Sequence, residues 1–381
     1  MFVPIIVIFA DRNLTRYLMG TYFSDSQIEF LIDLLSTNTP SGYEYQMAKV
    51  LDKSMSNYCS IGTDHIGNFY MATGTKGGLK ILITAHADEV GFQIVHIDKN
   101  GFAYIRSVAN VDPQTVPGNR VIAISKEGEI LGVIGKNSPH VIDGKEREKV
   151  PHLCDMWVDF GFSSDKEATK YIEVGDYVTL YSKPTITNNG KRIVSKSLDN
   201  KICVFALSEI IKRISKKALP IEVIGVATAQ EELGSRGAFV AANNIKPDIA
   251  LCMDVGIATD IPSMSIQNYG LFELGKGAGI VRNANNNEVL TNIIINNAIK
   301  NGIPYQKIIG HKPNGGTESA IIQMAQEGIA TANISIPNRY MHSLVEMCDL
   351  HDVESAIELI ISTITDLSSS KKEDFNLYLN N

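Results

Sequence analysis

The sequence predicts an α/β fold with a mixed, mostly parallel sheet, flanking helices and a small inserted all-β domain. Short apolar runs that recur along the chain have the composition of buried parallel strands, and amphipathic stretches separate them. Between residues 92 and 186 the pattern changes to short strands with turn signals. The length of 381 residues is consistent with about two domains.

The α/β domain is expected to be discontinuous, covering residues 25–91 and 187–368. Its first part begins with a helix near Asp25–Leu35, which two strands follow. Residues 1–24 are expected to form an N-terminal extension, and residues 369–381 a polar tail. Helices in the second part are expected near Lys201–Lys216, Glu288–Asn301, Glu318–Gln326 and Val353–Ser368.

The segment 92–186 is expected to form the inserted β domain. Asn100-Gly101 and Glu127-Gly128 each stand between two runs of strand composition, which is typical of hairpins. Such a domain would either mediate the assembly of subunits or act as a lid that shapes the neighbouring pocket.

Two adjacent carboxylates, Glu231 and Glu232, follow the apolar run Ile221–Ala227. Adjacent side chains at the end of a strand point in different directions, so the two can take different roles. One can bind a metal ion while the other handles protons just outside the ion's coordination shell. The pair alone is weak evidence, because Glu-Glu pairs also occur as favourable charges in the first turn of a solvated helix.

Further carboxylates and histidines occur at equivalent places. His86 and Asp88 follow one apolar run, and Asp254 follows another. His342 lies in a turn after a third run, and Asp199 stands at or near the N-terminus of a helix. Ligands of open α/β sheets collect beyond the carboxyl ends of the strands, so we expect these side chains to lie close together.

This set of side chains predicts hydrolysis at a metal centre. The candidate ligands are His86, Asp199, Glu232, Asp254 and His342. Oxygen and imidazole donors without cysteine suit zinc, cobalt or manganese in a catalytic site. Two divalent ions and three carboxylates leave one positive charge, which a bridging hydroxide would neutralise as the nucleophile. Glu231 would act as general base, and Asp88 would fix the tautomer of His86.

Each of these residues also has an ordinary structural interpretation. A single histidine is more often structural than a ligand, Asp199 could be a helix N-cap, and Asp254 could belong to a turn. Those interpretations leave a cluster of acids at one sheet edge unexplained, whereas a metal site accounts for all of them. The other histidines lack such neighbours and are expected to be structural: His65, His96, His140, His152, His311 and His351.

The composition argues against several other classes of protein. The net charge of −7 and the absence of a basic stripe argue against nucleic-acid binding. Five scattered cysteines without Cys-x-x-Cys spacing indicate free thiols in a reducing compartment, which predicts a cytoplasmic protein. The apolar start Phe2–Ala10 is too short to span a bilayer, and no other segment could, so no membrane association is expected. Gly275–Gly279 lacks the spacing of a phosphate loop.

Several motifs resemble those of one family, over roughly residues 27–367 and in order. The matching segments are Ser41–Glu44, Ala85–Phe92, Ser197–Lys201, Gln230–Ala238, Met253–Val255, Gly316–Ala320 and Arg339–Ser343. On these segments the chain resembles the dinuclear-metal aminopeptidases of the TET, glutamyl-aminopeptidase and deblocking aminopeptidase family, metallopeptidase family 42. Some relatives in this family carry an endoglucanase description.

The resemblance implies a zinc-exopeptidase-like fold and two divalent ions per subunit, zinc or cobalt, with manganese as an alternative. Asp199 would bridge the two ions. His86 and Asp254 would complete one site. Glu232 and His342 would complete the other.

The resemblance also implies the remaining roles, the substrate and the partners. Glu231 would be the general base, and Asp88 the partner of His86. Substrates would be peptides with a free N-terminus, and the chain would form a homo-oligomer built from dimers, up to a dodecamer. The family usually has Asp where Glu318 stands and Arg where Lys201 stands, and neither position is a ligand in this scheme.

Alternative functions stay open at this point. The metals could serve hydrolysis of another amide, such as an acyl-amino acid or a dipeptide. A glycoside hydrolase of the endoglucanase kind would use two carboxylates without a metal and would leave both histidines without a role. A catalytically inactive assembly or binding protein would be expected to have lost a ligand, and none of the positions is lost. The preferred N-terminal residue, the native metal and the size of the oligomer are not predicted.

Overall fold

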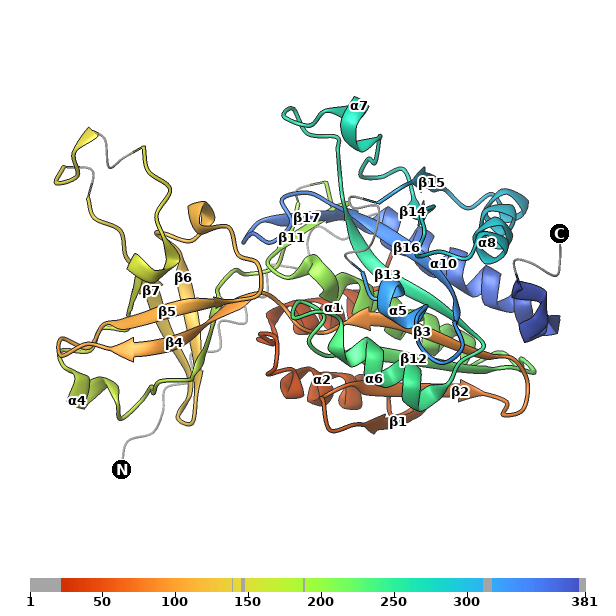
Figure 1. Cartoon of the computed structure of the whole chain (residues 1–381), viewed down its shortest axis with the longest axis horizontal. Helices are drawn as coiled ribbons and strands as arrows, with labels where there is room; N and C mark the ends of the chain where they lie inside the picture. The colour runs from red at the N-terminus through yellow and green to blue at the C-terminus, as the bar shows by residue number, and fades with distance from the viewer. Residues whose placement is uncertain (1–21, 139, 145–147, 188, 311–316, 377–381) are drawn as a thin grey trace.

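The computed structural model describes residues 22–138, 140–144, 148–187, 189–310 and 317–376. Most of the expected N-terminal extension, the end of the expected tail, His311 and Gly316 lie outside the described residues. The described chain forms an α/β unit with a β barrel beside it, on the left of Figure 1. In this part of the chain, every helix is too short or too polar to cross a membrane.

An eight-stranded sheet forms the centre of the α/β unit, in the order β1-β2-β12-β3-β13-β16-β14-β15. The four central strands, β12, β3, β13 and β16, are parallel, whereas β2 and β14 join them antiparallel. The predicted mixed, mostly parallel sheet is therefore confirmed. The strands are β1 Ser60–Thr63, β2 Phe69–Gly74, β3 Lys80–His86, β12 Glu222–Thr228, β13 Ile249–Ile257, β14 Ala278–Val281, β15 Tyr305–Ile308 and β16 Ala330–Asn338.

Helices cover both faces of this sheet, which explains the continuous apolar runs of its central strands. Successive residues of a strand point to opposite faces. Ile81 and Ile83 accordingly join one core with α1 (Asp25–Ser36), α2, α5, α8 and α10, while Leu82 joins another with α6 and α9. The remaining helices are α2 Tyr45–Met55, α4 Asp165–Ala168, α5 Leu198–Ile214, α6 Arg236–Ile245, α7 Ile266–Tyr269, α8 Glu288–Asn301, α9 Ser319–Ile322 and α10 Leu350–Asp366. Short 3₁₀ helices cover Pro113–Thr115, Leu153–Asp155, Leu367–Ser369 and Lys372–Phe375.

The β barrel closes in the order β4-β5-β8-β7-β6-β9 and has its own apolar core. Both predicted hairpins are confirmed, since β4 pairs antiparallel with β5 and β6 with β7. Gly101 and Gly128 have φ values of 91° and 105°, which a turn accommodates most easily with glycine. The limits predicted for the two domains stay predictions. The barrel strands are β4 Gly91–Ile97, β5 Ala103–Val108, β6 Arg120–Ser125, β7 Gly128–Ile134, β8 Trp157–Asp159 and β9 Tyr177–Leu180.

A third, three-stranded sheet of β10 (Thr185–Ile186), β11 (Arg192–Ser195) and β17 (Glu346–Asp349) was not predicted. Its strands are short, and β17 comes from a part of the sequence far from β10 and β11. Beta strand β17 leads directly into α10, and β11 ends shortly before α5. The small sheet therefore holds together the segments that lead into α5 and α10.

Several helices differ from their predicted limits. The helix expected over Glu318–Gln326 is the single turn α9. Four helices were not predicted at all, namely the longer α2 and α6 and the single turns α4 and α7. In α2 the buried residues Met47, Leu51 and Met55 follow a spacing of four, which is a helical signal that the prediction missed. By contrast, α8 has the predicted limits.

Candidate metal centre

The parallel strands bring the predicted residues to one edge of the sheet. Residue His86 ends β3, and its register partner Thr228 ends β12, so the segment after β12 starts beside it. Asp254 lies two residues beyond Cys252, which pairs with Thr84 of β3. All seven predicted site residues are linked by contacts of 4.0 Å or less at this edge: His86, Asp88, Asp199, Glu231, Glu232, Asp254 and His342.

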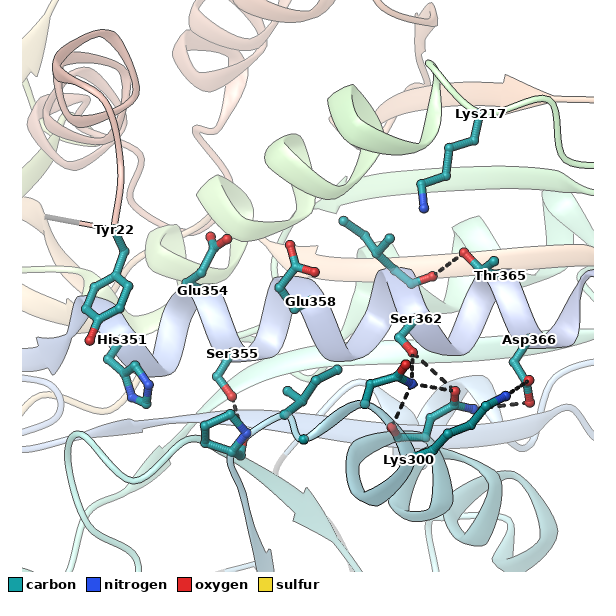
Figure 2. A pocket seen from close by; sticks show the side chains of 16 residues that line it. Tyr22, Lys217, Lys300, His351, Glu354, Ser355, Glu358, Ser362, Thr365 and Asp366 are labelled. Atoms are coloured by element: carbon teal, nitrogen blue, oxygen red, sulfur yellow. Dashed lines mark hydrogen bonds and ion pairs between the residues drawn. The ribbon is translucent and has the colours of Figure 1, made fainter.

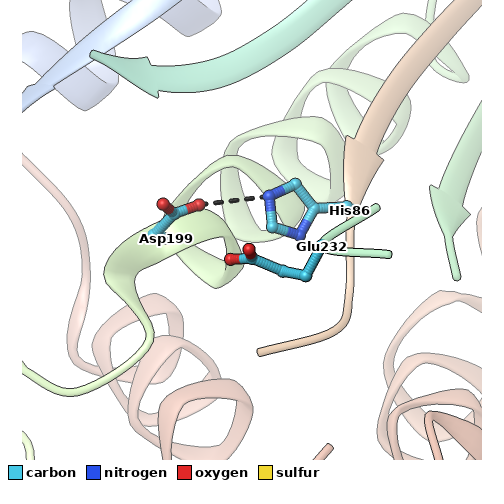
Figure 3. A group of neighbouring side chains, drawn as sticks. All are labelled: His86, Asp199 and Glu232. Carbon is cyan, nitrogen blue, oxygen red and sulfur yellow. Dashed lines mark ion pairs between the residues drawn. The ribbon is translucent and has the colours of Figure 1, made fainter. Parts of the chain in front are cut away.

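His86 faces three carboxylates with its Nε2 atom. The distance from Nε2 to Asp199 Oδ1 is 3.1 Å, to Asp254 Oδ1 3.8 Å and to Glu231 Oε2 4.0 Å. The histidine is buried, with 2% of its surface exposed. Figure 3 shows the ring at the end of β3, pointing toward Asp199 with Glu232 beside it.

His342 faces the same centre from the turn after β16. Its Nε2 atom lies 3.2 Å from Asp199 Oδ2 and 3.2 Å from Glu232 Oε1. The two oxygens of Asp199 therefore point to different histidines, Oδ1 to His86 and Oδ2 to His342. This arrangement divides the centre into a His86 half and a His342 half with Asp199 between them.

The donor atoms fit divalent metal ions. In a tetrahedral shell with bonds of 2.0–2.1 Å, two ligand atoms lie about 3.3 Å apart. The observed separations of 3.1 Å and 3.2 Å between the histidine nitrogens and the Asp199 oxygens are close to that value. His86, Asp199 and Glu232 each offer a ligand atom within 4.8 Å of the others. A set of imidazole nitrogens and carboxylate oxygens suits zinc, cobalt or manganese.

Asp88 holds several parts of the centre in place. Its Oδ1 atom lies 3.4 Å from His86 Nδ1, which fixes the side of the ring that faces away from Asp199. The backbone amides of Glu231 and Glu232 donate to Asp88 at 2.9 Å and 3.1 Å, and the Ser41 hydroxyl donates as well. Burial tends to raise the pKa of Asp88, but the hydrogen bond and charge of His86 outweigh it and lower the pKa. This carboxylate connects the end of β3 to the segment after β12.

The crowded carboxylates need positive charge. Burial raises the pKa of Glu231 to about 8, and the charges of Glu232 and Asp88 add to the rise against the opposing charge of His86. Burial is also the main cause of the raised pKa of Asp254. Burial alone would lower the pKa of His342, but Asp199 and Glu232 raise it to about 11. Protons or cations must therefore neutralise this cluster, and divalent ions are suited to the task.

Two groups that contact the ligands were not predicted. The backbone carbonyl of Asn110, from the loop after β5 of the barrel, lies 2.8 Å from His342 Nδ1. The Glu346 carboxylate accepts hydrogen bonds from the backbone amides of Asp199 and His342. A backbone carbonyl leaves no trace in a sequence. Glu346 left none either, because an acid between Val345 and Met347 has the alternation of a side chain on the solvent face of a strand, although it is buried here.

The two departures from the family pattern lie beside the centre and are buried. Lys201 donates from Nζ to the Thr37 carbonyl at 2.6 Å and lies 3.3 Å from Glu89 Oε1. Burial lowers the pKa of Lys201 to about 7. Glu318 accepts a hydrogen bond from the Thr228 hydroxyl at the end of β12.

A groove elsewhere on the surface has no comparable cluster of possible metal ligands. This groove, of about 670 Å³, runs beside α10 and α8, with Tyr22 and His351 at one end (Figure 2). Polar groups on its walls bind one another: Asn301 donates to Ser362 at 2.9 Å, and Lys300 lies 3.5 Å from Asp366. The cluster at the strand ends, and not this groove, is the candidate site.

Comparisons with known proteins identify the family and the fold. The family model of the M42 glutamyl aminopeptidases matches residues 67–359. A lysyl aminopeptidase of Pyrococcus furiosus is 31% identical, over 89% of this chain and 97% of its own length. The crystal structure of a TET aminopeptidase from a marine sediment archaeon has a TM-score of 0.87 at 32% identity, covering 92% of this chain and 99% of that one. The TET1 peptidase of Pyrococcus horikoshii, which can assemble into a tetrahedron or a large octahedral shell, has a TM-score of 0.80 at 30% identity, covering 89% and 99%. The chain therefore belongs to the M42 family of glutamyl aminopeptidases, a family of metal-dependent peptidases.

Proposed function

We propose that this chain is an aminopeptidase that uses two divalent metal ions to remove the N-terminal residue from peptides. The observation that carries the proposal is the position of Asp199, whose two oxygens lie 3.1 Å and 3.2 Å from different histidines. A carboxylate placed in this way can bind one ion with each oxygen. His86 and Asp254 would complete one ion's shell, and Glu232 and His342 the other's.

Zinc or cobalt suits these donors, with manganese as an alternative. When bound, such ions supply Lewis acidity, which polarises a peptide carbonyl and lowers the pKa of a water molecule. The chain's own contribution is to fix the donors. Asp88 orients His86 through Nδ1, and the Asn110 carbonyl does the same for His342.

Glu231 is the proposed general base. Its Oε1 accepts a hydrogen bond from Ser235 at 3.1 Å, and its Oε2 lies 4.0 Å from His86 Nε2. One oxygen is thereby held while the other faces the ligand cluster. From that position Glu231 can take a proton from the attacking water and return it to the leaving amine. Asp88 supports this position through the Glu231 backbone amide.

We also propose the substrates and partners. Substrates would be peptides with a free N-terminus, as for the aminopeptidases this chain is similar to. A homo-oligomer built from dimers, up to a dodecamer, is proposed by analogy with the TET1 peptidase that forms large shells. The barrel would serve that assembly. The free cysteines favour a reducing compartment, the cytoplasm.

The proposal is tested with matched free and N-acetylated peptides. Protein stripped with a chelator and then reloaded with zinc or cobalt should release the first residue from the free peptides only, and stripped protein should release none. Cleavage of acylated amino acids or dipeptides alone would move the function to another amide. Cleavage of a β-glucan without metal would favour the glycoside hydrolase, and no cleavage with metal bound would overturn the enzyme assignment.

A further inference from the structure

Glu346 is a buried carboxylate next to the His342 half of the metal centre. It is the first residue of β17, and 2% of its surface is exposed. Its Oε2 accepts a hydrogen bond from the backbone amide of Asp199 at 2.8 Å, and its Oε1 accepts one from the backbone amide of His342 at 2.8 Å. One side chain thus connects the main chain of two proposed ligands.

Both of these ligands lie in segments that regular secondary structure does not hold. Asp199 has φ −74° and ψ 102°, which are not helical values, although it lies in the first turn of α5. His342 has a φ of 61°, and Tyr340 in the same turn has a φ of 60°. Residues other than glycine adopt this left-handed conformation only where the surroundings hold them in it. The two hydrogen bonds to Glu346 hold the backbone of Asp199 and of His342 in these conformations.

A carboxylate suits this task because both of its oxygens are acceptors. Each oxygen takes one backbone amide proton, so the carboxylate sets the spacing between the two backbone segments. The Asn338 side chain adds a longer hydrogen bond of 3.4 Å to Oε2. Glutamine has the same shape but offers one acceptor, and its amino group would face a second donor. Aspartate keeps both acceptors but is shorter by one methylene.

We propose that Glu346 is a positioning residue that sets the distance between Asp199 and His342 and so the affinity of the His342 half for its metal ion. The inference rests on the function proposed above. It assigns Glu346 no contact with substrate. Its effect passes through the backbone of the two ligands. His342 belongs to one half only, whereas Asp199 is shared, so the His86 half should be affected less.

The test is a metal titration of Glu346→Gln. Stripped wild-type and variant protein are titrated with zinc, and cobalt-loaded protein is examined by its visible spectrum. We expect the ion of the His342 half to bind about 10–100-fold more weakly, the usual effect of removing a group that orients a ligand, and the other ion to be weakened clearly less. The cobalt spectrum should change for the ion of the His342 half. Glu358→Gln, the same chemical change at an exposed position of α10, should leave both affinities unchanged.

Glu346→Asp keeps the negative charge but shortens the side chain, so it separates the effect of position from that of charge. It also replaces the glutamine variant if that variant does not fold. It should weaken the same ion, because the shorter side chain cannot reach both amides. Wild-type affinity for both ions in either folded variant would overturn the proposal, as would equal weakening of the two ions. A loss of thermal stability with unchanged metal affinity would show a structural role only. Failure of the proposed function itself is distinguishable, because it would appear in the wild-type protein, either as binding of fewer than two ions or as no metal-dependent release of N-terminal residues.

Discussion

The two halves of the candidate metal centre are built in different ways. His86 ends a central strand, is 2% exposed and is oriented by Asp88, which lies two residues further along the chain. His342 lies in a turn beyond β16, its side chain is 24% exposed, and it is oriented by the carbonyl of Asn110 from the barrel. One half belongs to the sheet, and the other is formed where the α/β unit meets the barrel.

This difference teaches that the inserted domain takes part in the site. Leu344, two residues after His342, packs against the apolar core of the barrel. A cleft lined by Asp199, Glu232 and His342 also has Leu180 of barrel strand β9 in its wall. The core of the sheet holds the His86 half in place, whereas the His342 half depends on how the barrel docks.

The largest effect is expected where the two halves meet. Replacing Asp199 by alanine removes the side chain whose two oxygens lie 3.1 Å from His86 Nε2 and 3.2 Å from His342 Nε2. We expect both ions to be lost and the activity to fall to that of chelator-treated protein. Metal content after dialysis, measured by elemental analysis, checks this. If either ion is retained in stoichiometric amount, Asp199 does not bridge the two halves.

Glu231→Gln should separate catalysis from metal binding. The carboxylate takes no part in the proposed metal shells, so both ions should remain. Activity should fall by about 10²–10⁴-fold, the usual contribution of a positioned general base. Parallel measurements of metal content and of kcat/KM on a free peptide decide this. Activity near that of the wild type would assign the base role to another group.

Alanine variants of the two histidines should compare the halves directly. His86→Ala and His342→Ala should each lose one ion and more than about 100-fold in activity, because each removes a donor. Added imidazole should restore part of the activity of His342→Ala only, since that side chain is 24% exposed whereas His86 is 2% exposed. Equal rescue of both variants would mean that solvent reaches the two halves equally.

Proton release should accompany metal binding at the His342 half. The pKa of His342 is raised from 6.5 to about 11 in the metal-free fold, so between these values the ring keeps a proton that an ion must displace. Raising the pH therefore removes a competitor, and affinity for the ion should increase by about tenfold per pH unit. In the metal-free protein, raising the pH has an unfavourable effect, on the stability of the fold. The stability that protonated His342 contributes is complete below pH 6.5 and is lost as the pH rises toward 11.

Calorimetric titrations in buffers of different ionisation enthalpy measure the protons released. Wild-type protein should release about one proton more than His342→Ala when each is loaded with zinc at pH 7. An equal number in both proteins would show that His342 is neutral before the metal binds.

The sequence predicted what local pattern determines. The apolar run of β3 and the residues that end it are neighbours in the chain, so the place of His86 and Asp88 followed from the strand itself. The predicted limits of α8 agree with the structure, in which Asn287 caps the helix and Gly302 ends it. The helix expected over Glu318–Gln326 was too long, because the chain continues after α9 in turns toward Gly328.

The contacts that complete the His342 half could not be predicted in this way. Glu346 binds the amide of Asp199 across 147 positions of sequence, and Asn110 binds His342 across 232. Each of these contacts pairs a side-chain atom with a backbone atom, and both depend on how separately folded parts meet. Periodicity and motifs describe a strand and its end, but they carry no information about how distant segments pack together.

The smallest effect is expected from Leu344→Ala, which tests the role of the barrel without touching a ligand. Leu344 is half-buried against the barrel core, so its truncation should cost about 1–2 kcal/mol of stability, less than a fully buried leucine. The looser turn should weaken the ion of the His342 half by about 3–10-fold and leave the other ion unchanged. Leu131→Ala, at a 55% exposed position on barrel strand β7, is the control and should change stability by less than about 0.5 kcal/mol. Equal weakening of both ions would remove the distinction between the halves, and unchanged affinity would mean that the turn keeps its shape without the barrel.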